Sequence, residues 1–197
     1  MAIMRSKITK GEGPSWLGIK KASLKSVKDE SSKYDWADVY LILEFDVEES
    51  KYTRPCKIVG SFEKNPDGTI MDCSLLKRIT YASDAFGFQG GVNQNGKCVD
   101  ENEEPIDDIA TFLESNFAHE EPNFEYLVYV FKELAKNGKT YTRIHSRFMR
   151  KGNGAEEELD SYIKFLLKKG YLKEAADDDA VTPDNDLKLD GLEIASL

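Results

Sequence analysis

Residues 126–148, with the sequence YLVYVFKELAKNGKTYTRIHSRF, decide between two incompatible folds. Asn137 and Gly138 separate two segments rich in β-branched and aromatic residues, and this pattern predicts a β-hairpin with a two-residue turn. A hairpin would complete a small barrel, whereas helices would make residues 122–173 a winged helix. The helical interpretation rests on apolar residues at helical spacing, namely Phe124, Leu127, Val128, Phe131 and Ala135.

The residue types in this stretch favour the hairpin. Residues 126–131 and 140–144 are mostly good strand formers, and their helix propensity is mediocre. A two-residue turn would direct Leu127, Tyr129 and Phe131 toward the core and would leave basic and aromatic side chains on the opposite, exposed face.

The same turn would place Lys132 directly opposite Arg143 on the neighbouring strand. Two like charges in this position repel each other, and a bound anion would remove the repulsion. The winged helix remains the alternative, because residues 132–138 also fit a helix end with a glycine cap.

The rest of the chain combines strand and helix patterns. Residues 39–47 alternate between apolar side chains at odd positions and a more polar set at even positions, which predicts a strand with one buried face. Residues 17–28 and 52–62 are expected to form two further strands. Helical stripes predict two helices, over residues 75–86 and from Pro105 onward. Acids in the first turn, lysines in the last turn and the terminating Gly170 predict a third helix over residues 155–169.

With the hairpin, the order is three strands, a helical insertion at about 73–121, two strands and a C-terminal helix at about 155–169. This is the order of a five-stranded OB-type barrel, so we predict a mainly β fold with helices. The expected organisation is a basic N-terminal arm (1–15), an OB-fold domain (16–173) and a disordered acidic tail (174–197).

Charge is distributed unevenly along the chain, whose formal net charge is −9. Residues 99–121 contain nine acidic and no basic residues, and residues 174–197 contain eight acidic residues and one lysine. Residues 1–28 and 122–173 are basic. Because the acidic residues are segregated, the negative total does not exclude a nucleic-acid partner.

The chain resembles the phage-encoded single-stranded DNA-binding proteins over roughly residues 16–150 and 174–197. The resemblance is carried by the element order, the charge layout and phrases such as VYLILEFDVEE and YLVYVFKELAKNGKTYTRI. It implies an OB fold whose basic groove and aromatic side chains hold the strand, and an acidic tail that recruits replication or recombination proteins. Family tails often end in an aromatic residue, whereas this chain ends in Leu197.

Binding of a single strand requires cations along the phosphates and flat side chains that stack on bases. The first three strands, the loop after the first strand and the hairpin supply both kinds of side chain. The alternative is that the tryptophans cap the core and the lysines are ordinary surface residues. The predicted binding residues are Trp16, Lys20, Lys21, Lys25, Lys33, Tyr34, Trp36, Tyr40, Arg54, Lys57, Tyr126, Lys132, Tyr141, Arg143 and Arg147.

The sequence gives little support for metal binding or enzymatic catalysis. The acidic stretch VDENEEPIDD lacks the glycine and the final glutamate of a calcium-binding loop. No Ser-His or Cys-His pairing with a third member is visible, so we expect no enzyme, no metal and no cofactor. The N-terminus lacks the apolar region of a signal peptide, and no apolar run approaches the ~20 residues of a membrane span. We therefore expect a cytoplasmic protein, located in the host cytoplasm if it is phage-encoded.

The expected function is sequence-tolerant binding and protection of single-stranded DNA during replication or recombination. Apolar residues among the acids of the tail (Leu187, Leu189, Leu192, Ile194 and Leu197) favour a peptide that docks on replication or recombination proteins. Self-association is also possible in such a protein. The alternatives are a winged-helix regulator that binds duplex DNA, and a protein-interaction module.

Overall fold

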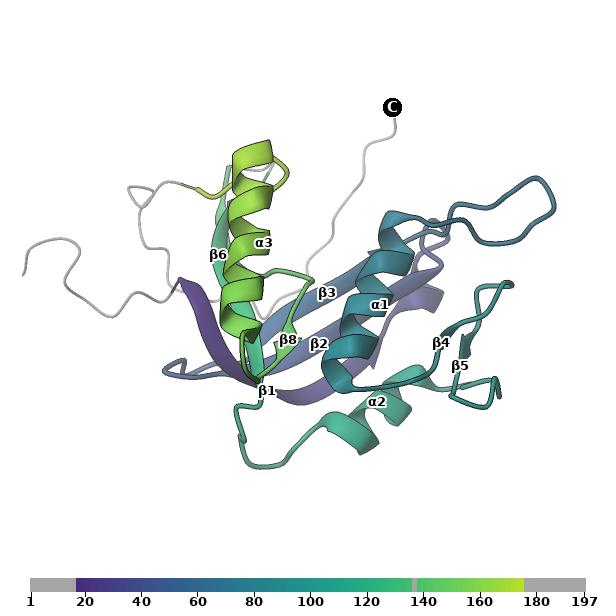
Figure 1. The fold of residues 1–197 in the computed structure, drawn as a ribbon, viewed down its shortest axis with the longest axis horizontal. Helices are drawn as coiled ribbons and strands as arrows, with labels where there is room; N and C mark the ends of the chain where they lie inside the picture. The colour runs from purple at the N-terminus through teal and green to yellow at the C-terminus, as the bar shows by residue number, and fades with distance from the viewer. Residues whose placement is uncertain (1–16, 136–137, 176–197) are drawn as a thin grey trace, which may run out of the picture.

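The structure is a computed structural model that describes residues 17–135 and 138–175. The predicted N-terminal arm and all of the tail beyond Ala175 lie outside the described residues. In chain order the elements are β1 (Gly18–Asp29), η1 (Ser31–Lys33), β2 (Val39–Val47), β3 (Arg54–Gly60), α1 (Ser74–Phe86), β4 (Gly91–Val92), β5 (Cys98–Val99), α2 (Ile109–Phe117), β6 (Tyr126–Leu134), β7 (Thr140–Ile144), β8 (Met149–Arg150) and α3 (Ala155–Lys169) (Figure 1).

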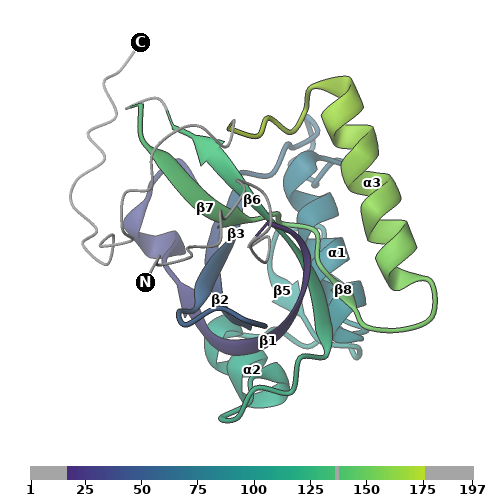
Figure 2. The ribbon, with the colours of Figure 1, turned by 90° about the vertical axis from the view of Figure 1, so that its left-hand side faces the viewer.

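Five strands form a closed barrel. The sheet order is β1-β2-β3-β7-β6-β8, and β1 also pairs with β6, which closes the ring (Figure 2). The pairs are antiparallel except for β3 and β7, which run parallel and meet at Cys56 and Ile144. The predicted mainly β fold with a five-stranded barrel is confirmed, and its strand order is compatible with the OB fold. The winged-helix alternative is wrong, because residues 126–134 and 140–144 are strands.

The barrel interior is filled by alternate side chains of its strands. The odd-numbered residues of β2 are buried, as the sequence alternation predicts. Phe45, Tyr126 and Phe148 make edge-to-face contacts with ring centroids 5.2–6.0 Å apart. Phe86 of α1 and Leu113 of α2 join the same core, so these two helices close one side of the barrel.

Both faces of β6 are buried, which the sequence did not indicate. Tyr126, Val128 and Val130 lie inside the barrel, whereas Leu127 and Phe131 form a second apolar cluster under α3. The prediction that the face bearing Tyr126 is exposed is therefore wrong. The C-terminal helix creates the second buried face and was predicted with its bounds.

The hairpin is present, but its register differs from the predicted one. Phe131 lies opposite Arg143, and Lys132 lies opposite Thr142, so the predicted pairing of Lys132 with Arg143 is wrong. The cause is the loop, because the Ala135 N–H donates to the Lys139 carbonyl (2.9 Å) and leaves three positions between them. Of these, Gly138 has a φ of +76°, a conformation that favours glycine.

The insertion contains more structure than the sequence indicated. The predicted first helix ends at Gly87, which has a φ of +71°. The second helix begins at Ile109 instead of Pro105, because the Asp108 carboxylate accepts a hydrogen bond from the Thr111 N–H (2.9 Å) and caps it there. The segment between the two helices contains a small antiparallel sheet, β4–β5.

Candidate nucleic-acid interface

The outward-facing side chains of β2 and β3 form a surface that we call the outer face. Because the odd positions of β2 point inward, its even positions point outward together with their partners on β3. In Figure 2 the three helices lie at the right of and below the barrel, and the β1–β2 loop (30–38) lies on the left. The outer face consists of Tyr40, Ile42, Glu44, Lys57 and Val59, of which Ile42 is buried and the other four are half-buried.

The β1–β2 loop is fixed at both of its ends. The Glu30 N–H donates to the Tyr40 carbonyl and the Tyr40 N–H donates to the Ser31 hydroxyl, both at 2.8 Å. At the other end the Phe62 N–H donates to an Asp38 carboxylate oxygen (2.7 Å), and the Ser61 hydroxyl donates to the Trp36 carbonyl. The loop therefore presents its side chains in a defined arrangement.

Three aromatic side chains gather where this loop meets the outer face, and we call them the aromatic cluster: Tyr34, Trp36 and Tyr40. The rings of Tyr34 and Tyr40 stack at 4.5 Å between centroids, and the Trp36 ring lies 5.9 Å from Tyr34 and 6.4 Å from Tyr40. Trp36 is 52% exposed. Partial burial raises the pKa of Tyr34 above its ordinary value. All three were predicted from the sequence, and the structure brings them together.

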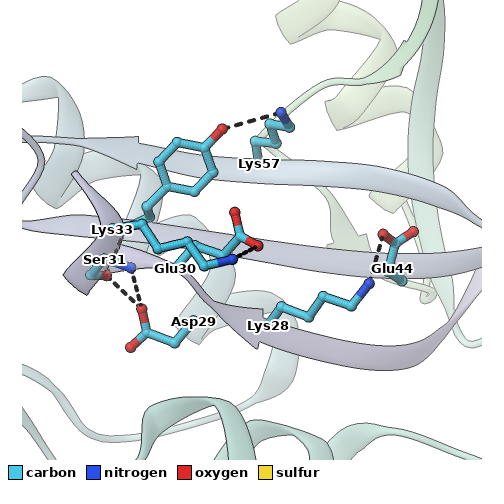
Figure 3. A network of polar contacts seen from close by, with 8 residues as sticks. Lys28, Asp29, Glu30, Ser31, Lys33, Glu44 and Lys57 are labelled. Carbon is cyan, nitrogen blue, oxygen red and sulfur yellow. Dashed lines mark hydrogen bonds and ion pairs between the residues drawn. The ribbon is translucent and has the colours of Figure 1, made fainter. Parts of the chain in front are cut away.

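Lys57 places a positive charge beside the aromatic cluster. Its ammonium group donates to the Tyr40 hydroxyl at 3.2 Å and lies 5.6 Å from the centre of the Tyr40 ring. Figure 3 shows this contact at the edge of the outer face. A flat exposed ring next to a cation is the pairing that stacking on a base and contact with its phosphate require.

Two ion pairs lie on β1, β2 and the loop between them (Figure 3). Lys33 lies 2.7 Å from the nearly buried carboxylate of Glu30, whose hydrogen bond raises the pKa of Lys33. Lys28 lies 3.9 Å from Glu44. The sequence analysis missed Lys28 and Glu44, although the alternation in residues 39–47 already placed Glu44 on the outward side. A phosphate approaching either lysine must compete with a carboxylate.

The predicted lysines of β1 lie toward the opposite end of this strand. Lys20 lies 3.6 Å from Glu49, and Lys21 lies 3.4 Å from Glu48. Lys25 donates to the Glu120 backbone carbonyl at 2.6 Å. The structure therefore does not bring these lysines into the aromatic cluster.

Beyond the barrel, β6 and β7 continue as a projecting hairpin, the β6–β7 arm (residues 131–135 and 138–143). Figure 2 shows the arm at the upper left. Arg143 lies 3.4 Å from Glu133 and 4.8 Å from the centre of the Tyr141 ring. Lys132 lies on the same arm, and the parallel pairing of β7 with β3 places the arm near Arg54, at the start of β3. The predicted residues thus form two groups, at the two ends of the outer face.

Besides Lys20, Lys21 and Lys25, three further predicted residues belong to neither group. Tyr126 is 1% exposed in the barrel interior, so no base can reach its ring. The Arg147 guanidinium lies between the rings of Tyr81 and Tyr162, at 4.6 and 4.3 Å, and joins α1 to α3. Trp16 lies outside the described residues.

Comparisons of the chain with protein-family models, with curated proteins and with solved structures find no match. Within the described ranges, no group of three or more His, Cys, Asp or Glu side chains is arranged to hold a metal ion. None of the described helices has the length and hydrophobicity required to cross a membrane. A proposal for function therefore depends on the outer face and the segments that flank it.

Proposed function

We propose that this chain is a sequence-tolerant single-stranded DNA-binding protein that holds the strand across the outer face. The observation that carries the proposal is the aromatic cluster, three contacting rings with Lys57 beside them on the strand 2–strand 3 surface of the barrel. In OB-type barrels this surface and the two loops that flank it bind oligonucleotides. Here the flanking segments are the β1–β2 loop and the β6–β7 arm.

The two ends of the outer face would contact different parts of the DNA strand. At the β1–β2 loop, Trp36 offers an exposed ring on which a base can stack, and stacking accepts every base because each has a flat π-face. At the arm, Arg143 and Lys132 supply cations for the phosphates. A duplex fits this arrangement less well, because its bases are already stacked and paired and cannot reach the rings.

The ion pairs on the outer face set the expected strength of the electrostatic contribution. Each phosphate that is neutralised in a single-strand complex contributes a log–log salt slope of about −0.7. Lys28, Lys33 and Arg143 are each paired with a carboxylate, so every phosphate contact of these three cations must displace an ion pair. Binding should weaken as salt rises, but with fewer phosphate contacts than the number of lysines suggests.

The biological role that fits such binding is protection of single strands during replication or recombination, and the sequence resemblance points to a phage origin. The acidic residues 174–197 contain leucine and isoleucine among the acids, and this composition supports a docking role toward replication or recombination proteins.

The decisive experiment compares oligothymidylate with a DNA duplex of equal length at two salt concentrations, using the intrinsic tryptophan fluorescence. Tighter binding of the oligothymidylate, weakened by salt, supports the proposal. Equal or stronger binding of the duplex contradicts it. The absence of binding at low salt would favour the protein-interaction module.

A further inference from the structure

The C-terminal end of α3 carries an exposed aromatic and basic surface, which we call the α3 end: Phe165, Lys168, Lys169, Tyr171 and Lys173. Phe165 is 49% exposed and Tyr171 is 75% exposed, and their ring centroids lie 6.4 Å apart. Within the described part of the chain, the three lysines take part in no ion pair. In this they differ from Lys28 and Lys33 on the outer face.

The fold holds this surface in place. Gly170 ends α3 with a φ of +71°, and the Tyr171 N–H donates to the Leu166 carbonyl (2.9 Å). Leu172 is buried in the cluster with Leu127 under α3, so the side chain of Tyr171 is left on the surface. The interaction of terminal lysines with the helix dipole accounts for Lys168 and Lys169. It does not account for two exposed aromatic rings beside them.

The α3 end is also close to the β6–β7 arm. The Ala175 N–H donates to the Lys132 carbonyl (2.9 Å), and the Tyr129 hydroxyl donates to the Glu174 carboxylate (2.7 Å). Residues 171–175 therefore run from α3 to the base of the arm, as Figure 2 shows. Four residues span at most about 14 Å, so the backbone of Tyr171 lies within that distance of Ala175 and the arm.

We propose that the α3 end is a second contact surface for the same single strand. DNA held on the outer face continues past the arm, its phosphates reach Lys168, Lys169 and Lys173, and a base stacks on Tyr171. The inference rests on the proposed function. It extends that function, because a second contact surface means that one protein covers a longer stretch of DNA than the barrel alone. Cations without partners next to exposed rings are complementary to a polyanion that carries flat bases.

The test compares a short oligothymidylate of about 6 nucleotides with a long one of about 20, since a single OB barrel covers roughly 4–16 nucleotides. The variant Lys168→Gln/Lys169→Gln/Tyr171→Ser should bind the long oligonucleotide roughly tenfold more weakly, with a salt slope shallower by about 1.4. It should bind the short one as the unchanged protein does. Lys64→Gln/Lys97→Gln, at two exposed lysines between β3 and α2, provides the control for charge and should leave both affinities unchanged.

Equal effects on both lengths, or no effect on either, would overturn the inference. The triple variant could also differ from the unchanged protein in its sedimentation coefficient while binding DNA with the same affinity. This result would overturn the inference and assign the α3 end to contacts between protein chains. Failure of the unchanged protein to bind either oligonucleotide is a separate result, because it contradicts the proposed function itself.

Discussion

The ammonium nitrogen of Lys28 lies 3.9 Å from a carboxylate oxygen of Glu44, across strands β1 and β2 on the outer face. This carboxylate competes with any phosphate for the lysine. We expect Glu44→Gln to raise the affinity for oligothymidylate roughly two- to fivefold at low salt, and to steepen the salt slope by about 0.7. Fluorescence titrations at several salt concentrations measure both quantities.

Glu104→Gln is the control for the change in net charge, because Glu104 is an exposed carboxylate of the insertion. It should leave the affinity nearly unchanged. If both variants strengthen binding equally, the effect comes from the total charge and the outer face has no special role.

The exposed ring of Trp36 should contribute through stacking. Removal of an aromatic side chain that stacks on a base costs about 1–3 kcal/mol. We therefore expect Trp36→Ala to weaken binding of oligothymidylate roughly 5- to 150-fold while the free energy of unfolding changes little. Met71→Ala, at a residue of comparable exposure between β3 and α1, should affect neither property. Unchanged affinity in Trp36→Ala would contradict the assigned stacking site.

Removal of residues 176–197 should strengthen binding of single strands. This truncation removes seven acidic residues and one lysine, so the net charge changes from −9 to −3, and it retains the contacts of Glu174 and Ala175. The gain should decrease at high salt, where charges more than roughly 8–10 Å apart are screened. Isothermal titration at two salt concentrations measures it, and equal affinities at low salt would show that the acidic residues do not compete with DNA.

Arg143 and Arg147 should respond to substitution in opposite ways. Arg147 lies between two tyrosine rings and 2.6 Å from Glu158, so Arg147→Gln should lower the free energy of unfolding by about 1–3 kcal/mol and leave DNA affinity unchanged. Arg143→Gln should weaken DNA binding with little change in stability. Urea unfolding and DNA titration of both variants test this pair, and a loss of affinity in a folded Arg147→Gln protein would contradict it.

The partly buried imidazole of His145 should make stability depend on pH. Burial lowers the pKa of His145 to about 4 from an ordinary value of 6.5, and the charges of Arg78 and Arg147 act in the same direction. Between these two values the unfolded chain binds a proton that the folded chain does not. Stability is therefore full above pH 6.5 and decreases as the pH falls toward about 4, by up to about 3 kcal/mol.

Urea unfolding at about pH 7 and about pH 4.5 measures this decrease, to which carboxylates also contribute. His145→Gln should make the decrease smaller, whereas His119→Gln should retain it, because His119 is an exposed residue near Glu125. A decrease of the same size in His145→Gln would show that other groups are responsible.

Much of the barrel could be predicted because its strands carry a clear signal. The alternation in residues 39–47 correctly identified the buried face of β2, and the acid-to-lysine gradient correctly identified α3. The aromatic cluster could be predicted as a set of residues, but its geometry depends on how the hydrogen bonds of Ser31 and Asp38 fix the β1–β2 loop.

The errors in the prediction for β6 have two physical causes, one for its buried face and one for its register. Both faces of this strand are apolar, because one lies inside the barrel and the other under α3, so hydrophobicity alone does not indicate which face is inside. A loop longer by one residue then shifts the register by one position, and every cross-strand partner changes, as for Lys132 and Arg143. The sequence did not indicate the structural role of Arg147, because the tyrosine rings that it contacts belong to residues distant in sequence.

The pairing of β1 with β6 joins residues 18–22 to residues 126–130, and this separation has a consequence during synthesis. At about 5–20 residues per second, β1 waits roughly 5–20 s before its partner leaves the ribosome. During that interval its backbone edge can pair with another nascent chain. Lys20 and Lys21 lie within the waiting segment, and lysines on an unpaired strand deter such aggregation. We expect these two lysines, which the sequence suggested for DNA binding, to deter such pairing of the growing chain before the barrel closes.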